Sequence, residues 1–216
     1  MNIELNNLII KNDKCATEQA LKFLCGKWNA YIIHTCILRP ASIIELKNIF
    51  SIIPPTSLQK KLSYLCENNL LYLDDKKYFA TNQATELLEI AKEIEDYLSR
   101  YVPELLDMDA KYNYVNKMIG QKWKARILWV LFNYKVVRFN ELCHCLEGIS
   151  HKVLKEVLDD LISTDMIIRK DYHEKTPKVE YLLTEQGHEM ARFVDKLRLW
   201  SEKYGLLTQK VTAYIS

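Results

Sequence analysis

The sequence of 216 residues has few of the features that mark secreted, membrane-bound or loop-rich proteins. It contains only five glycines and five prolines, which leaves little room for long flexible loops. No apolar run reaches the roughly 18 residues that a transmembrane helix needs, and the N-terminus lacks the basic and then apolar profile of a signal peptide. The six cysteines follow no small-scaffold spacing. We therefore expect a cytoplasmic protein with reduced thiols and no membrane partner.

Motifs for catalysis and for metal binding are also missing. No nucleophile–base pair, phosphate-binding loop or carboxylate pair occurs in a suitable context, so we expect no enzymatic activity and no cofactor. The segment Cys143-His144-Cys145 suggests a metal site. On a helix, however, residues two apart point about 200° apart, so both sulfurs cannot face one ion. We expect no metal site there.

The charge is nearly balanced but unevenly distributed. The formal net charge of +2 is too small to indicate a nucleic-acid partner by itself. Residues 1–105 carry 12 basic and 13 acidic side chains, whereas residues 106–216 carry 18 basic and 15 acidic ones. The basic excess therefore lies in the second half of the chain.

The most informative pattern runs over residues 139–184. A Gly-Ile turn leads to Ser150, a good N-cap, and then to apolar residues spaced three and four apart, which predict a helix. Two β-rich runs, residues 167–168 and 179–183, then enclose a polar loop, which is typical of a long hairpin. Helix, tight turn, helix and hairpin form the winged helix-turn-helix plan. Its second helix fits the major groove of DNA, and its hairpin, or wing, reaches a neighbouring phosphate or the minor groove.

These residues resemble the HxlR-type family of bacterial transcriptional regulators, within the MarR-like winged-helix superfamily. The matching segments are Gly120, Lys122-Trp123, Arg138-Phe139-Asn140-Glu141-Leu142, Gly148-Ile149-Ser150, Lys152-Val153-Leu154, Pro177-Lys178-Val179-Glu180-Tyr181, Leu183-Thr184-Glu185 and Gly187. The resemblance implies a fold that is mainly α with small β-hairpins. It also implies a sequence-specific transcriptional regulator whose partner is double-stranded DNA.

An internal repeat covers most of the chain. Lys27-Trp28 recurs as Lys122-Trp123, an offset of 95, and the helical leucines of the first half recur at an offset of 96. Tyr78 recurs as Tyr181 at an offset of 103. The offset grows by seven across the hairpin alone, so the first copy should have the shorter wing.

The repeat predicts two tandem winged helix-turn-helix domains, residues 1–105 with a short wing and residues 106–216 with a full wing. In the family, units of this type pair through their first and last helices into a twofold dimer. The apolar faces of segments 84–101 and 185–204 each need a cover, and each is the obvious cover for the other. We expect an intramolecular pseudo-dimer that acts on an asymmetric operator of two half-sites. Two chains could still associate through the tail after Gly205.

The candidate DNA-binding residues lie on the second helix of each copy and on the second wing. They are Thr56, Ser57, Gln59, Lys60 and Lys61 in the first copy, and Ser150, His151, Lys152, Lys155, Arg169, Lys170, His173, Lys175 and Lys178 in the second. Cationic side chains bind phosphates, and polar side chains at the start of the helix can contact base edges.

Each copy departs from the family in a different way. The second helix of copy two has Glu156 and Val157 where family members usually carry Arg, often beside Gln. The short wing of copy one contains Asp74 and Asp75, which would repel phosphate. We therefore expect the two half-sites to be bound differently. The alternative is a degenerate winged-helix module that binds a protein and no DNA.

Cys15 stands at the position of the family's N-terminal cysteine, which in several members senses oxidants or electrophiles. A helix start and the neighbouring Lys14 would favour the thiolate, so Cys15 is a candidate redox sensor. The alternative is an inert thiol. Copy two has Ala110 at this position, so only the first copy could carry such a sensor.

Cys25, Cys36 and Cys66 lie among apolar residues and are expected to be core side chains. The sequence identifies no small-molecule effector.

Overall fold

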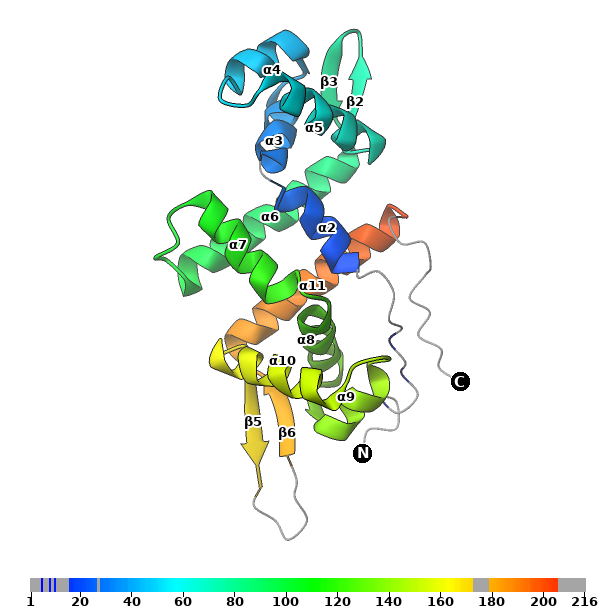
Figure 1. Cartoon of the computed structure of the whole chain (residues 1–216), viewed down its shortest axis with the longest axis vertical. Helices are drawn as coiled ribbons and strands as arrows, with labels where there is room; N and C mark the ends of the chain where they lie inside the picture. The colour runs from blue at the N-terminus through cyan, green and yellow to red at the C-terminus, as the bar shows by residue number, and fades with distance from the viewer. Residues whose placement is uncertain are drawn as a thin grey trace. The chain divides into compact units, whose positions relative to one another are not determined.

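The computed structural model describes Leu5, Leu8, Ile10 and residues 16–26, 28–172 and 179–205. The chain divides into two compact units: Ala20–Tyr112, here called the N-unit, and Met1–Gln19 with Asn113–Ser216, here called the C-unit. The described part is mainly helical, with two small antiparallel sheets (Figure 1), which confirms the predicted fold class at this level. None of the described helices is long and apolar enough to cross a membrane.

The same order of elements occurs twice along the chain. The first series is α2 (Ala16–Leu24), α3 (Asn29–Leu38), β1 (Ala41–Ser42), α4 (Ile43–Ile49), α5 (Pro55–Glu67), β2 (Leu71–Asp74), β3 (Lys77–Ala80) and α6 (Asn82–Tyr101). The second is α7 (Met108–Ile119), α8 (Lys122–Tyr134), β4 (Val136–Arg138), α9 (Phe139–Cys145), α10 (His151–Ser163), β5 (Ile167–Asp171), β6 (Val179–Leu183) and α11 (Glu185–Lys203). The sheets have the strand orders β1-β3-β2 and β4-β6-β5.

Each hairpin lies beside one helix, β2–β3 beside α5 and β5–β6 beside α10 (Figure 1). The buried faces of these two helices use matching leucines. Leu58, Leu62 and Leu65 of α5 and Leu154, Leu158 and Leu161 of α10 are all at most 1% exposed. Both helices therefore sit on their cores in the same rotational phase, as the repeat predicts.

The helices α5 and α10 also end in the same way. Asn69 and Asp165 follow these helices with φ angles of 56° and 55°, in the left-handed region. A strand begins two residues later in each unit, β2 at Leu71 and β5 at Ile167. In the C-unit, Thr184 closes the turn, because its hydroxyl donates to the carbonyl of Asp165 at 2.6 Å and accepts from the amide of Gly187 at 2.9 Å. The second of these bonds caps the start of α11.

The two wings differ at their tips. The turn between β2 and β3 contains only Asp75 and Lys76, with φ angles of 39° and 61°. Positive φ at both central positions is typical of a type I′ turn, which suits a tight two-residue hairpin. The tip of the second wing, residues 173–178, lies outside the described residues.

The N-terminal segment belongs to the C-unit by its contacts. The amide of Ile10 donates to the carbonyl of Cys145 at 2.7 Å, and the amide of Glu147 donates to the carbonyl of Ile10 at 3.1 Å. Ile10 therefore groups with the second winged helix, whereas the predicted division at 105/106 placed it with the first. The cause is backbone pairing between segments far apart in sequence, which a repeat search cannot detect.

Candidate nucleic-acid interface

The outward face of α5 is polar, with one basic and one acidic side chain. Opposite the buried leucines lies a shallow, open groove lined by Thr56, Gln59, Lys60, Ser63, Tyr64 and Glu67. Thr56, Gln59 and Lys60 are exposed, as the sequence predicts. Hydroxyl, amide and ammonium groups on one helical face can pair with the donors and acceptors that base edges present in a major groove.

Ser57 and Lys61 lie at the sides of α5 rather than at the centre of this face. Ser57 is exposed, but Lys61 is half-buried beside the core leucines, and burial lowers its pKa. Lys61, expected on the outward turns of the helix, is therefore less exposed than Lys60. Its position follows from helical phase, because Lys61 precedes the buried Leu62 by one residue and follows the buried Leu58 by three.

The first turn of α10 is basic. His151, Lys152 and Lys155 are exposed, and the His151 ring lies edge-on to Phe139 at 5.6 Å between ring centroids. The Ser150 hydroxyl accepts a 3.2 Å hydrogen bond from the amide of Val153. Ser150 thus caps the helix, as predicted, and leaves the cations at its start free to face solvent.

The same face of α10 becomes acidic one turn later. Glu156 is exposed and lies 4.0 Å from the ammonium of Lys152, and Asp159 is also exposed. A surface ion pair of this length is weak. The two acids would nevertheless repel phosphates beside the second half of the helix.

The wing of the N-unit has exposed apolar side chains and a balanced charge, because Lys76 and Lys77 offset Asp74 and Asp75. Tyr72 stacks on Phe79 with ring centroids 5.2 Å apart, and Leu73 is 58% exposed. Asp74 pairs in register with Lys77 across the hairpin, and Asp75 occupies its turn. This wing therefore offers a phosphate backbone little net positive charge.

The wing of the C-unit is more basic. Arg169 and Lys170, the predicted phosphate contacts, are exposed on β5, and Arg169 forms a 3.0 Å ion pair with Asp171. This pair offsets part of the charge of Arg169 and makes Lys170 the stronger phosphate candidate. His173, Lys175 and Lys178 lie outside the described residues.

Glu180 organises the base of this wing, which the sequence interpretation missed. Its carboxylate accepts a 2.8 Å hydrogen bond from the Tyr172 hydroxyl and lies 3.7 Å from the guanidinium of Arg138. Arg138 and Glu180 are paired residues of β4 and β6. The strand β4 has only three residues, too few to show an alternating pattern, so the sequence carried no signal for this pair.

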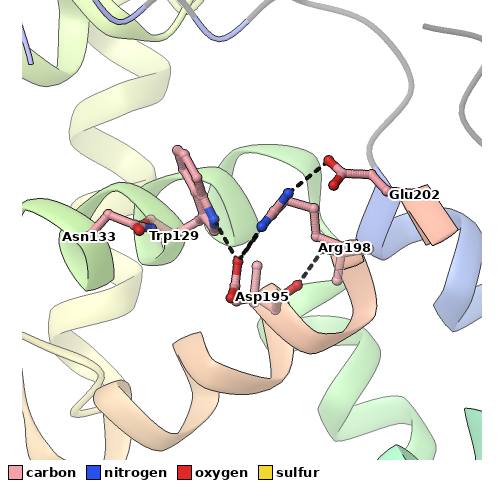
Figure 2. A network of polar contacts seen from close by, with 7 residues as sticks. Trp129, Asn133, Asp195, Arg198 and Glu202 are labelled. Carbon is pink, nitrogen blue, oxygen red and sulfur yellow. Dashed lines mark hydrogen bonds and ion pairs between the residues drawn. The ribbon is translucent and has the colours of Figure 1, made fainter. Parts of the chain in front are cut away.

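A polar network fixes α11 against α8 (Figure 2). The indole Nε1 of Trp129 donates to Asp195 at 3.0 Å, and Arg198 donates to the same carboxylate oxygen at 2.8 Å. Arg198 also bonds Glu202 at 2.7 Å, and its guanidinium lies 5.6 Å from the centre of the Trp129 ring. These contacts stabilise the scaffold of the C-unit without touching α10.

The described thiols are poorly suited to redox chemistry. Burial raises the pKa of Cys25 to about 12, of Cys36 to about 11 and of Cys145 to about 12. Burial also raises the pKa of Cys66 and of Cys143. Because the thiolate is the reactive form, all five are disfavoured as nucleophiles at neutral pH. Cys15 lies outside the described residues.

The Cys143-His144-Cys145 segment spreads its side chains around α9. Cys145 is fully buried, with its thiol near the carbonyl of Leu142 at 3.6 Å, whereas His144 is exposed. Within the part of the chain that the structure describes, no group of three or more such ligands is placed to hold a metal ion.

Comparison of the sequence with known proteins identifies one family. The model of the HxlR-like helix-turn-helix family matches residues 118–209. MalR of Fusobacterium mortiferum is 38% identical over 90 residues, which are 42% of this chain and 85% of MalR. YdzF of Bacillus subtilis (strain 168), named an uncharacterized HTH-type transcriptional regulator, is 33% identical over 96 residues, 44% of this chain and 88% of YdzF. A MarR-family structure from Enterococcus faecalis V583 has 29% identity and a TM-score of 0.42, and the match covers 46% of this chain and 90% of that one.

Proposed function

Because this chain belongs to the HxlR-like helix-turn-helix family, we propose that it is a transcriptional regulator in which one chain carries two DNA-binding winged helix-turn-helix domains. The observation that carries the proposal is the repeated order of elements. In each series an exposed helix, α5 or α10, is followed at once by an antiparallel hairpin. This is the arrangement with which winged-helix proteins contact a major groove and the adjacent backbone.

The pseudo-dimer is part of this proposal. In the family, two chains pair through their first and last helices, and the long helices α6 and α11 occupy the last position of the two series here. Both carry an apolar face, with Leu87, Ile94 and Leu98 buried on α6 and Met190 and Leu197 buried on α11. A covalently joined pair would give one chain both half-site contacts.

Unequal contacts should make the operator asymmetric. In the N-unit the exposed side chains of α5 can contact base edges, but the wing carries Asp74 and Asp75. In the C-unit Lys152 and Lys170 favour phosphate, whereas Glu156 weakens the case for base contacts. Binding to the half-site of the N-unit would then depend more strongly on base sequence than binding to the half-site of the C-unit.

Selection of bound duplexes from a random pool, with the full chain, tests this function. We expect two unlike half-sites about one helical turn apart, and binding that weakens steeply as salt rises. A palindromic site would contradict the asymmetric pseudo-dimer. The absence of salt-dependent retention on any duplex would contradict DNA binding itself.

A redox response through Cys15 is a further part of the proposal. The physical support is indirect: burial raises the pKa of all five described cysteines, which leaves Cys15 as the remaining thiol of the six. An adduct near the start of α2 could alter the pairing of the two units and so the spacing of their recognition helices.

A protein-docking role of the N-unit is the second candidate, and one specific observation favours it. Leu38, Ile44 and Ile52 are 72%, 68% and 77% exposed, an unusual set of apolar side chains around α4. The C-unit has Asn140 and Gly148 where the N-unit has Ile44 and Ile52. If docking replaced DNA contact, Ile44→Asn would abolish partner binding and Lys60→Ala would leave DNA retention unchanged.

A further inference from the structure

A buried lysine connects three helices of the C-unit. The side chain of Lys124 on α8 is 4% exposed, and its ammonium group donates a 2.9 Å hydrogen bond to the carbonyl oxygen of Lys117 on α7. The same group forms an ion pair with Oδ2 of Asp160 on α10, a buried oxygen atom of a side chain that is 37% exposed. α7, α8 and α10 therefore meet at one cation.

Both contacts have a clear physical cause. Lys117 is in the last turn of α7, where carbonyl groups lack partners within the helix and where a positive charge is favourable. A buried ammonium group also needs an anion, because an unpaired charge is strongly disfavoured in the interior. Asp160 supplies that anion from the recognition helix.

This link constrains α10 in a way that its apolar contacts do not. Leu154, Leu158 and Leu161 hold the helix against the core, but hydrophobic contact is non-directional. The hydrogen bond to the Lys117 carbonyl fixes the ammonium group of Lys124, and its attraction to Asp160 depends on the distance between the two charges. Asp160 lies about 12 Å along the helix from Lys152, so a tilt of about 10° at Asp160 would move Lys152 by about 2 Å. Such a shift is larger than a hydrogen bond to a base or phosphate tolerates.

We infer that Lys124 and Asp160 are positioning residues, which transmit the orientation of α7 to the recognition helix α10 and thereby set its contacts with DNA. The inference about DNA contacts rests on the proposed function, whereas the link between α7 and α10 does not. The helix α7 carries the chain from the N-unit, which ends at Tyr112, into the C-unit, which resumes at Asn113. A displacement of α7 would thus reach α10 through this ion pair.

The N-unit connects the equivalent helices by different chemistry. At the positions that match Lys124 and Asp160 it has Asn29 and Tyr64. Asn29 is buried, and its Oδ1 has no hydrogen-bond partner among the described residues. The Tyr64 ring of α5 instead contacts Phe23 of α2, with centroids 5.8 Å apart. Removing the charge at this linking position should therefore affect the orientation of the recognition helix in the C-unit only.

Hydrogen exchange of the full chain without DNA tests the link itself. Asp160→Asn removes the anion at its partly exposed end, and Asp160→Glu keeps it. Asp195→Asn is the matched control, because it breaks the network between α8 and α11 (Figure 2) and leaves α10 untouched. We expect Asp160→Asn to accelerate amide exchange in α10 about tenfold with little change in α11, and Asp160→Glu to behave like the wild type. Faster exchange in α10 from Asp195→Asn as well, or none from Asp160→Asn, would overturn the link.

DNA binding by the same variants tests the positioning role, at a temperature where circular dichroism shows all of them folded. We expect Asp160→Asn and Lys124→Met to weaken binding to a selected duplex about tenfold, the free energy of roughly one base contact. Binding to a random duplex should change less than about twofold, because phosphate contacts tolerate misplacement. Asp160→Glu should restore selectivity.

Equal losses on both duplexes, or an equal loss of selectivity from Asp195→Asn, would show that the ion pair only stabilises the fold. If Lys124→Met does not fold, the comparison of Asp160→Asn with Asp160→Glu decides. A wild-type chain that binds no duplex would contradict the proposed function, and the exchange experiment would still decide whether the link exists.

Discussion

The N-unit and the C-unit hold their recognition helices on matching leucines but present different chemistry to solvent. The exposed face of α5 is polar with few charges, and the hairpin beside it carries Asp74 and Asp75. The face of α10 begins basic and turns acidic at Glu156, whereas its hairpin carries Arg169 and Lys170. The buried leucines of the two helices match, whereas the exposed positions do not. We therefore propose that base contact and phosphate contact are divided between the two units.

The two units also differ in how the recognition helix is oriented. In the N-unit an aromatic contact between Phe23 and Tyr64 joins α2 to α5. In the C-unit the Lys124–Asp160 ion pair does so between α8 and α10, with α7 attached through a carbonyl group. The aromatic contact depends on the packing of two rings, whereas the ion pair depends on the distance between a buried ammonium group and a carboxylate. The C-unit should thus be the more rigid and the more easily disrupted of the two.

The largest expected effect concerns the start of the last helix in each unit. A Cβ atom on Gly187 would lie 1.8 Å from the carbonyl oxygen of Met166, whereas the matching residue of the N-unit, Ala84, is already an alanine and fully buried. Gly187→Ala should lower the free energy of unfolding by about 3 kcal/mol, because backbone must move to admit the methyl group. Ala84→Gly should cost about 1 kcal/mol. Urea unfolding followed by circular dichroism measures both, and a Gly187→Ala loss no larger than that of Ala84→Gly would refute the close approach.

The second effect separates base contact from phosphate contact. Lys60→Ala should reduce discrimination between the selected duplex and a random one by about tenfold, the value of one lost base contact. Lys61→Ala should change it less than about twofold, because this side chain is half-buried at the edge of the core. Competition binding at fixed salt measures the ratio. A larger effect from Lys61 than from Lys60 would mean that α5 is presented to DNA by a different face.

The third effect concerns the charge of the two wings, which substitutions can lower in the C-unit and raise in the N-unit. Lys170→Ala should weaken binding to all duplexes alike and make the salt dependence shallower by about 0.9 log units per lost phosphate contact. Arg169→Ala should do less, because Asp171 already offsets that charge. Asp74→Lys, at the position that matches Lys170, should strengthen binding to all duplexes. A change of sequence preference from these wing variants, without a change of salt slope, would reverse the assignment.

The smallest effect concerns the thiols. At pH 7 Cys25, with a pKa of about 12, holds a thiolate fraction of roughly 10⁻⁵. Raised pKa values make alkylation slow at neutral pH, and the rate should increase as the pH rises toward those values. Cys15 should therefore be labelled first by a limiting electrophile at pH 7, which mass spectrometry of the intact and digested chain can show. Preferential labelling of another cysteine, or unchanged DNA binding with Cys15 fully modified, would leave Cys15 a structural thiol.

Much of the fold followed from sequence because helical periodicity and turn residues are local signals. The cap at Ser150 with the helix that follows it and the hairpin strand at 179–183 were predicted correctly. Strands β1 and β4 were not predicted, because two or three residues cannot show an alternating pattern. The half-buried position of Lys61 was not expected, because helical periodicity does not resolve which residues lie at the edge of an apolar face. The Lys124–Asp160 pair joins residues that no local pattern relates.

The measured mass of the complex on a minimal duplex, by native mass spectrometry or light scattering, tests the central claim most directly. The duplex should contain the selected site with both half-sites and no flanking sequence. The pseudo-dimer predicts one chain per duplex, and it predicts that a duplex with a single half-site binds far more weakly. Two chains required on each minimal duplex would contradict the claim that one chain supplies both DNA-binding domains.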